Sequence, residues 1–356
     1  MALIRPFRAV RYDEATAGPL ATLVAPPYDV IDDAARGELL ARSPYNVVRL
    51  TLPQSEEEAA GAWRVWQEEG ILDRDDEPSY WVLVQDYVGP DGVARTRTGL
   101  VASLRVEPYA TGTVLPHERT HRGPKEGRLR LVRATGVQLE PIFLLYDGAA
   151  PFAVPEREPD LEAESARLWR LEDDLAGFFA DRQLLIADGH HRYETALAFH
   201  EQEGTEASAF MPVVLVSTED PGVTIFPTHR VFSGREASWN GSSSEASEAL
   251  AALERVPADH GAFVEYDGGA RVVDPGPGTL AVQVVDELGH DGLAYTPDAQ
   301  EAVRRVDEGE ASVAYLLRPT RIEDVFAAAR RGEVLPQKTT FFYPKLLSGL
   351  LFHPVD

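Results

Sequence analysis

Residues 184–196 read Leu184-Leu185-Ile186-Ala187-Asp188-Gly189-His190-His191-Arg192-Tyr193-Glu194-Thr195-Ala196. The apolar run 184–187 predicts a buried strand, and the glycine after Asp188 allows a sharp turn. A helix over Tyr193–His200 is expected to follow this turn. The stretch therefore predicts a strand, a tight turn and a helix, with polar side chains gathered at the turn.

The side chains at this turn suit an anionic ligand. The free N–H groups and the positive end of a helix make such a junction a phosphate site. Arg192 can bind phosphate through two parallel hydrogen bonds, and His190 and His191 can donate hydrogen bonds or protons. Asp188 can hold a metal ion or orient a histidine. The plainer alternative is that Asp188 caps the helix and the histidines pack in the core.

Strands and helices alternate along the rest of the chain. Strands are expected over Asn46–Leu52, Tyr80–Val88, Val93–Val106, Ile142–Tyr146, Leu184–Ala187, Pro212–Thr218, Val223–Phe226 and Ser312–Leu317. Helices are expected after an Asp32 cap to about Ala41, from Ser55 to Gly70, and over Ala299–Val306, Ile322–Arg331 and Leu346–Phe352. Because this alternation lacks regular βαβ order, the fold class is α+β (mixed α/β).

A polar, serine-rich stretch at Arg235–Ser247 favours a boundary between two parts of the chain. We therefore expect a core over residues 1–235 and an α/β region over residues 236–356. The second region is expected to fold back and complete the site of the first.

The composition limits the classes of function. The chain has 356 residues with 34 basic and 58 acidic side chains, for a net charge of −24. Such a surface repels phosphate backbones and anionic lipids, so no nucleic-acid or membrane partner is expected. The absence of cysteine excludes disulfides and thiol nucleophiles. No signal peptide or apolar run of spanning length is apparent, so a cytoplasmic location is expected.

Basic residues are concentrated between His117 and Arg133. This stretch contains six lysines and arginines but only two acidic residues, Glu118 and Glu126, in an otherwise acidic chain. Such a basic island focuses anions locally, although a solvated helix face is the alternative. Arginine outnumbers lysine throughout, and the chain keeps only three lysines. These are Lys125, Lys338 and Lys345, each in a segment that other features mark as functional, although chance retention under nucleotide bias is an alternative.

His117-Glu118-Arg119-Thr120-His121 matches the H-E-x-x-H pattern of zinc metalloproteases. Pro116 before it and Gly123-Pro124 after it leave barely two helical turns, and the flanking cations disfavour a zinc ion. Zinc proteolysis is therefore the least favoured hypothesis. Glu118 is better interpreted as a carboxylate for Mg²⁺ or for a substrate amine.

Two further segments carry candidate ligands. Lys338–Lys345 places two lysines among aromatic residues, and it could close over a nucleotide with Phe341, Phe342 or Tyr343 stacking on a base. The aromatic residues could equally form the core beneath a terminal helix. His229 and Arg230 follow an apolar run, where a phosphate ligand and a pair satisfied in the core are both open.

The 184–196 stretch closely resembles the signature of the domain-of-unknown-function 1015 family. The resemblance covers nearly the whole chain, since further family motifs occur in the same order: Pro26-Pro27-Tyr28-Asp29-Val30-Ile31, Pro116-His117-Glu118, Lys125–Arg133, Pro227-Thr228-His229-Arg230 and residues 336–345.

The Asp-Gly-His-His-Arg turn is also similar to that of free-serine kinases with the ParB/sulfiredoxin-like fold. This resemblance implies a ParB/sulfiredoxin-like core with a mixed sheet, in which Gly189, His190, His191 and Arg192 hold the phosphates of ADP or ATP. It also implies an acidic base near the N-terminus, for which Asp29 is the positional candidate.

The leading hypothesis is an ATP- or ADP-dependent phosphotransferase that uses Mg²⁺ and acts on a small hydroxyl substrate, free serine by analogy. The catalytic candidates are Asp29, Glu118, Asp188 and His191, of which Asp188 and Glu118 are also the metal candidates. Nucleotide-binding candidates are Gly189, His190, His191, Arg192, Lys125, His229, Arg230, Lys338, Tyr343 and Lys345. The alternative is a nucleotide-binding, NTP-hydrolysing regulator of ParB-like fold, followed by a phosphatase acting on a phosphorylated amino acid. The oligomeric state is open, with a homodimer as one option.

Overall fold

The computed structural model describes residues 1–118 and 122–355. Within these residues the largest sheet has nine strands, in the order β6-β11-β8-β12-β5-β4-β10-β9, with β1 beside β5. Its strands are β1 (Ile4–Arg5), β4 (Tyr80–Val88), β5 (Ala94–Arg105), β6 (Val114–Leu115), β8 (Ile142–Tyr146), β9 (Leu161–Ala163), β10 (Ala166–Leu171), β11 (Leu184–Asp188) and β12 (Phe210–Ser217). The pairs β11–β6 and β12–β8 are parallel and the others are antiparallel, so the sheet is mixed.

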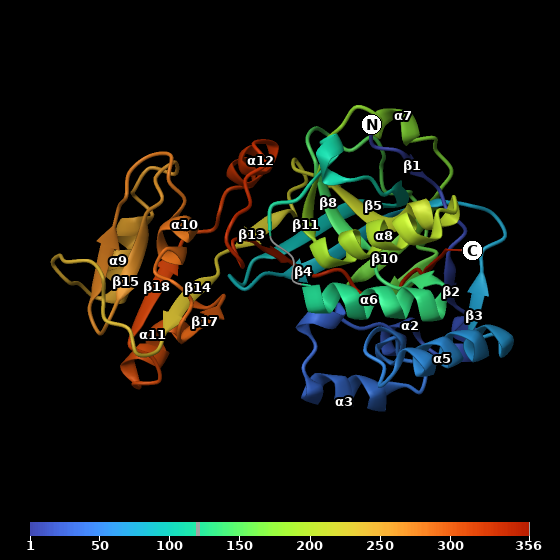
Figure 1. The fold of residues 1–356 in the computed structure, drawn as a ribbon, viewed down its shortest axis with the longest axis horizontal. Coiled ribbons are helices and arrows are strands. Elements are labelled where there is room, and N and C mark those ends of the chain that lie inside the picture. The colour runs from blue at the N-terminus through green and yellow to red at the C-terminus, as the bar shows by residue number, and fades with distance from the viewer. Residues whose placement is uncertain (119–121, 356) are drawn as a thin grey trace.

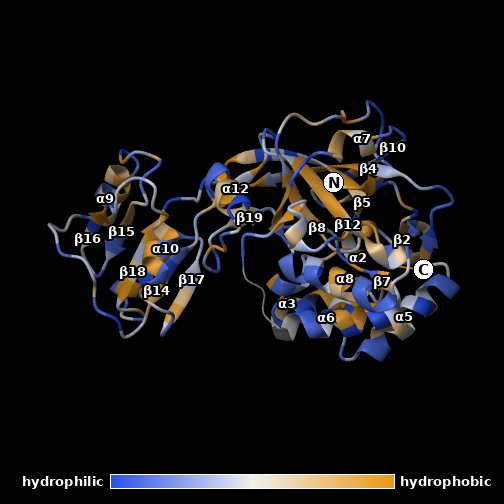
Figure 2. Cartoon of the chain, turned by 45° about the horizontal axis from the view of Figure 1, so that its top comes forward, coloured by the Kyte–Doolittle hydropathy of each residue, from blue (hydrophilic) through white to orange (hydrophobic). Residues whose placement is uncertain are grey.

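Both faces of this sheet are covered. Successive residues of β11 alternate between two apolar clusters, with Leu184 and Ile186 in one and Leu185 and Ala187 in the other. Helices α6 (Arg122–Thr135) and α8 (His190–Glu203) lie side by side over the sheet, and α5 (Glu56–Glu68) packs against α6 (Figure 1). The hydrophobic strands of the sheet lie inside a polar outer layer (Figure 2).

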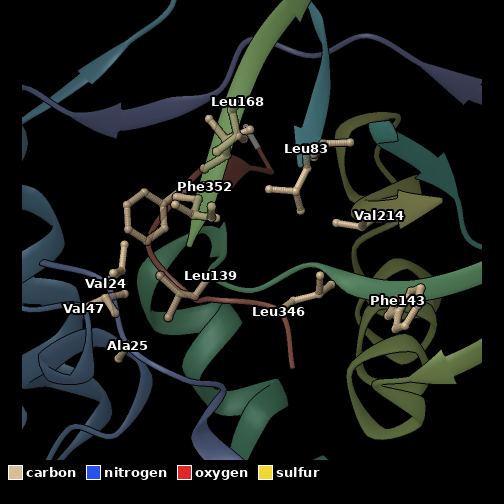
Figure 3. Close-up of a cluster of buried hydrophobic side chains, with 14 of the residues drawn as sticks. Val24, Ala25, Val47, Leu83, Leu139, Phe143, Leu168, Val214, Leu346 and Phe352 are labelled. Carbon is tan, nitrogen blue, oxygen red and sulfur yellow. The ribbon is translucent and has the colours of Figure 1, made fainter. Parts of the chain in front are cut away.

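The N-terminal segment and the chain's last residues share one core. Val24 and Val47 pack in the same cluster as Phe143 of β8 and as Leu346 and Phe352 near the C-terminus (Figure 3). The smaller elements around this core are β2 (Val10–Tyr12), β3 (Leu72–Arg74), α1 (Glu14–Ala17), α2 (Leu20–Leu23), α3 (Asp33–Arg42), α4 (Val48–Thr51), β7 (Val137–Gln138) and α7 (Ala176–Phe179). The C-terminus is therefore part of the lobe built on the nine-stranded sheet, which is the larger of two lobes (Figure 1).

A second sheet has five strands in the order β16-β15-β18-β14-β17 and forms the smaller lobe (Figure 1). Its elements are β14 (His229–Phe232), α9 (Ala246–Leu253), β15 (Phe263–Tyr266), β16 (Ala270–Val273), α10 (Ala281–Asp286), β17 (Leu293–Thr296), α11 (Ala299–Asp307) and β18 (Val313–Leu317). The chain enters it after β13 (Thr224–Phe226) and returns through α12 (Ile322–Arg330). Strand β19 (Phe341–Tyr343) then pairs with β13, and β20 (His353–Pro354) pairs with β7. The division of the chain at residues 235 and 236 stays a prediction.

The α+β fold class is confirmed, and so are most of the expected elements. The Asp32 side chain caps α3 by accepting a hydrogen bond from the Ala35 N–H at 2.8 Å. The Ser55 hydroxyl caps α5 in the same way through the Glu58 N–H at 3.2 Å. The strands expected over Tyr80–Val88 and Val93–Val106 are β4 and β5, which pair as an antiparallel hairpin. No helix among the described residues is long and apolar enough to cross a membrane.

Two expected elements are wrong. The strand expected over Asn46–Leu52 is instead helix α4, because the Asn46 side chain accepts a hydrogen bond from the Val48 N–H at 3.0 Å and begins a helical turn. No helix forms over Leu346–Phe352, where isolated bridges at Ser348 and Phe352 lie on either side of a bend. Ser348 bridges Ala25 and Phe352 bridges Val10, so pairing with distant segments replaces helical hydrogen bonds.

Candidate functional site

A cleft of about 340 Å³ opens at the end of β11, where the strand passes into α8. Five segments of the chain contribute to it: the 3-10 turn Tyr28–Val30, Glu118, the β11–α8 turn, Thr228 between β13 and β14, and the C-terminal segment, residues 335–345. Its lining residues are Tyr28, Asp29, Val30, Glu118, Ala187, Asp188, Gly189, His190, His191, Arg192, Thr228, Gln337, Lys338, Thr340, Phe341 and Lys345. The structure thus brings together Asp29, Glu118, residues 188–192, Lys338 and Lys345, all of which are sequence-predicted site residues.

The turn at the base of the cleft requires glycine. Gly189 has φ 99°, and a Cβ atom there would lie 2.6 Å from Cγ2 of Ile142 and 3.2 Å from Cζ of Arg192. Helix α8 begins at His190, three residues earlier than predicted, and the Tyr193 N–H donates to the Gly189 carbonyl. The first N–H groups of a helix have no acceptor within that helix. Those of α8 therefore belong to the turn that lines the cleft.

Asp188 is bound by two cations. One of its carboxylate oxygens accepts a hydrogen bond from Nη2 of Arg192 at 2.6 Å, and the other accepts one from Nζ of Lys345. Burial raises the pKa of Asp188, but the charges of Lys345 and Arg192 outweigh it and lower the pKa to about 2. Asp188 is therefore ionised at neutral pH and holds Lys345 at the cleft. Arg192 is 7% exposed and also donates to the Pro141 carbonyl.

Two histidines pack together beside the turn. The His117 main-chain N–H donates to Nε2 of His190 at 3.3 Å, and the two ring centroids are 4.7 Å apart. Burial lowers the pKa of His117 to about 4 and that of His190 well below its usual range, so both rings are neutral near pH 7. Because Nε2 of His190 accepts a hydrogen bond, its proton lies on Nδ1. Sequence reasoning did not assign His117 to the site, although the Pro116-His117-Glu118 motif was a signal for it.

His117 also contacts the C-terminal segment, since its Nε2 and Oγ1 of Thr340 are 2.9 Å apart. This bond ties the residue before Glu118 to the segment that carries both cleft lysines. Glu118 itself forms a backbone bridge with Leu335. The Pro116–Glu118 motif and the C-terminal segment therefore form one wall of the cleft.

Glu118 is the second cleft carboxyl group whose pKa departs from its ordinary value. Burial raises its pKa to about 6, although the nearby charge of Lys338 opposes the increase. A carboxyl group that titrates close to neutral pH in a cleft is a candidate for general acid–base chemistry. Asp29 lines the same cleft on an exposed turn.

Four of the predicted nucleotide ligands lie outside the cleft lining. Nζ of Lys125 lies 3.3 Å from a carboxylate oxygen of Glu194. His229 is buried, and its Nδ1 accepts a hydrogen bond from the Leu317 N–H. The other two are Arg230, which is bonded to backbone carbonyls, and Tyr343, which packs edge-to-face against Tyr87 and Phe226. Of the three candidate stacking aromatics, only Phe341 lines the cleft, and Phe342 is buried against Phe143.

The described residues contain no group of three His, Asp or Glu side chains placed to hold a metal ion. Asp188 does not fit a magnesium ion, because both of its oxygens accept hydrogen bonds from cations. Glu118 and Asp29 remain as carboxylates of the cleft, and Mg²⁺ needs only one or two when it also binds substrate phosphates. Residues 119–121, with Arg119 of the basic segment and His121 of the H-E-x-x-H pattern, lie outside the described residues.

A family model described as "Protein of unknown function (DUF1015)" matches residues 4–307. No curated protein matches the sequence. Similar solved structures include a free serine kinase in complex with AMP, at 21% identity and TM-score 0.39 over 67% of this chain and 89% of that one. They also include a conserved hypothetical protein from Pyrococcus furiosus, at 19% identity and TM-score 0.37 over 67% and 92% of the two chains. A third is SbnI with a C-terminal truncation from Staphylococcus aureus, at 14% identity and TM-score 0.41 over 68% and 84%.

Proposed function

Because the chain belongs to the DUF1015 family, which is described only as being of unknown function, we propose an activity from the chemistry of its cleft. We propose that the protein transfers a phosphoryl group from ATP or ADP to the hydroxyl group of a small molecule. The observation that carries the proposal is one cavity lined by two lysines, a helix N-terminus and a carboxyl group whose pKa is about 6. Phosphoryl transfer requires mainly positioning and neutralisation of charge, and these groups supply both.

In this proposal the phosphates lie against the β11–α8 turn. The N–H groups at the start of α8 and the positive end of the helix face the anion. Lys345, held by Asp188, and Lys338 on the same C-terminal segment would neutralise the oxygens that gain charge during transfer. Arg192 acts mainly by fixing Asp188, because its guanidinium group is already bonded to Asp188 and Pro141.

Glu118 is assigned the role of general base. It would accept the proton of the attacking hydroxyl group, and a pKa near 6 leaves it ionised at neutral pH while still able to take a proton. A magnesium ion, bound mainly by the nucleotide phosphates, would be held by Asp29 and would supply charge neutralisation. The similarity of the 188–192 turn to that of free-serine kinases makes serine the first acceptor to test.

The test is ³¹P NMR of the purified protein with MgCl₂, either ATP or ADP, and free serine or a pool of other small hydroxyl compounds. We expect a phosphomonoester signal that grows as the nucleotide is consumed and that requires the acceptor. Glu118→Gln should remove this signal and keep nucleotide binding, and Lys338→Ala should weaken both. Lys125→Ala is the matched control, because Lys125 pairs with Glu194 outside the cleft lining.

Two outcomes contradict the proposal. Conversion of the nucleotide to inorganic phosphate alone would favour the NTP-hydrolysing regulator. An unchanged nucleotide spectrum with every acceptor would exclude transfer to these substrates. A signal that persists at full rate in Glu118→Gln would keep the activity but overturn the assignment of the base.

A further inference from the structure

Lys338 has a backbone conformation that lysine rarely adopts. Its φ is 58°, in the left-handed region where glycine and asparagine are favoured. It occupies a tight turn in which the Thr339 N–H and the Thr339 hydroxyl both donate to the Pro336 carbonyl. A non-glycine residue in this region persists only where the surrounding structure holds it there.

Arg230 is bonded to both sides of this turn. Its Nη2 donates to the carbonyl oxygens of Gln337 and Lys338, each at 3.2 Å, and its Nη1 donates to that of Thr228. Arg230 is 3% exposed. In the part of the chain that the structure describes, no carboxylate forms an ion pair with it. A buried guanidinium group without a carboxylate partner is costly, so its backbone hydrogen bonds must compensate for the lost water.

Arg230 and the turn that it contacts belong to different lobes of the protein. Arg230 lies on β14, in the five-stranded sheet of the smaller lobe, whereas the turn belongs to the segment that returns to the larger lobe. Oγ1 of Thr320, which follows the last strand of that sheet, donates to the Thr339 carbonyl at 3.1 Å. Both ends of the small lobe are therefore bonded to the backbone around Lys338.

We propose that Arg230 is a positioning residue that fixes the Lys338 ammonium group in the cleft through the carbonyls of Gln337 and Lys338. It thereby links the orientation of the five-stranded sheet to the state of the cleft. The inference rests on the proposed function for the role of Lys338, but the contact itself does not. It replaces the expectation that Arg230 binds phosphate directly, because Arg230 does not line the cleft and is already bonded to three carbonyls.

The first experiment uses no ligand. The chain has only three lysines, so protein labelled with ¹³C and ¹⁵N at lysine gives three backbone signals, which Lys→Arg variants assign. The ¹³Cα shift reports the left-handed conformation of Lys338. We expect this signature to be lost in Arg230→Met and kept in Arg271→Met, a control on β16 of the same sheet whose arginine pairs with Asp267. An unchanged Lys338 shift in Arg230→Met would overturn the proposal.

The second experiment measures ATP affinity in a double-mutant cycle of Arg230→Met and Lys338→Ala. We expect each single variant to bind roughly tenfold more weakly and the double variant to bind no more weakly than Lys338→Ala alone. Arg230→Lys should lose as much as Arg230→Met, because an ammonium group lacks the planar fork that reaches both carbonyls. If the loss of ATP affinity in the double variant equals the product of the two single losses, Arg230 is instead a direct phosphate ligand. The same conclusion would follow if Arg230→Lys kept the wild-type affinity for ATP.

These outcomes separate the two proposals. If the wild-type protein binds neither ATP nor ADP, the proposed function fails, while the ligand-free shift still decides the role of Arg230. If ATP binds and the shift of Lys338 does not depend on Arg230, the positioning role fails and the proposed function stands.

Discussion

The guanidinium group of Arg97 donates a hydrogen bond of 2.8 Å to the carbonyl oxygen of Pro344, the residue before the cleft lysine Lys345. Arg97 lies on β5 and is 2% exposed, with its guanidinium 4.5 Å from the ring centre of Phe143. Its Nη2 also donates to the side-chain oxygen of Gln85 at 2.6 Å. Burial lowers the pKa of Arg97 to about 10, so it stays charged at neutral pH. The core of the large sheet therefore fixes the backbone beside Lys345, as Arg230 does beside Lys338.

Replacing Arg97 should cost both stability and ligand affinity. We expect Arg97→Lys to lower the free energy of unfolding by about 1–3 kcal/mol, because lysine leaves buried acceptors at Gln85 and Pro344 unsatisfied. Urea unfolding measures this change. Arg105→Lys, at an exposed position on the same strand, is the control and should change it by less than about 0.5 kcal/mol. Equal effects of the two substitutions would contradict the role given to Arg97.

Local pattern was sufficient to predict the β11–α8 turn and most strands of the large sheet. The apolar run 184–187 indicates a buried strand by itself, and the glycine after Asp188 indicates a turn, since Gly189 has positive φ. Caps at Asp32 and Ser55 likewise depend only on neighbouring residues. The grouping of residues 188–192, Lys338 and Lys345 in one cleft was expected from the chemistry of these residue types, whereas Asp29 was expected there only from the resemblance to free-serine kinases.

The misplaced elements depend on distant partners that no local pattern records. An apolar run such as Asn46–Leu52 suits a strand or a buried helix equally. The Asn46 side chain decides between them, because it donates to the carbonyls of Thr22 and Val24 while accepting from the Val48 N–H. The segment Leu346–Phe352 has helical periodicity, but its backbone bonds Ala25 and Val10. Arg230 looked like a phosphate ligand because an arginine that binds backbone carbonyls has the same local sequence as one that binds a ligand.

Gly189→Ala should disrupt the β11–α8 turn. The new Cβ would meet Ile142 at 2.6 Å in a backbone conformation that alanine disfavours. We expect a loss of about 2–4 kcal/mol in the free energy of unfolding, together with loss of nucleotide binding. Gly204→Ala at the other end of α8 is a matched control, with φ 65° and no atom within 4 Å of its Cβ. It should cost only about 1 kcal/mol and leave binding intact. Similar losses in the two variants would show that steric contact at Gly189 does not matter.

The buried carboxyl of Glu118 predicts a pH dependence of stability without nucleotide or magnesium. Burial raises its pKa from the ordinary 4.5 to about 6, so folding favours the protonated form. Its contribution is fully favourable below pH 4.5 and is lost as the pH rises through 6. Glu118→Gln cannot ionise and escapes this loss. We therefore expect the variant to match the wild type near pH 4 and to exceed it by about 2 kcal/mol above pH 7.

Urea unfolding of both proteins from pH 4 to pH 8 measures this difference. Glu126→Gln, at an exposed position on α6, serves as the control and should change the free energy of unfolding by less than about 0.5 kcal/mol. A gap between Glu118→Gln and the wild type that stays constant across the range would mean that Glu118 titrates normally. A gap that grows toward low pH would mean that its carboxylate is stabilised by the fold and not penalised.

Lys338→Gly separates the effect of residue 338 on stability from its effect on nucleotide affinity. Glycine adopts φ 58° without strain, so we expect the variant to be as stable as the wild type or more stable by up to about 1 kcal/mol. Nucleotide affinity should nevertheless fall about tenfold, because the ammonium group is gone. Thermal unfolding and ATP titration measure the two effects on the same protein. A loss of stability with unchanged affinity would show that the lysine serves the fold, whereas the expected opposite pattern would show that its unfavourable backbone is kept for the ligand.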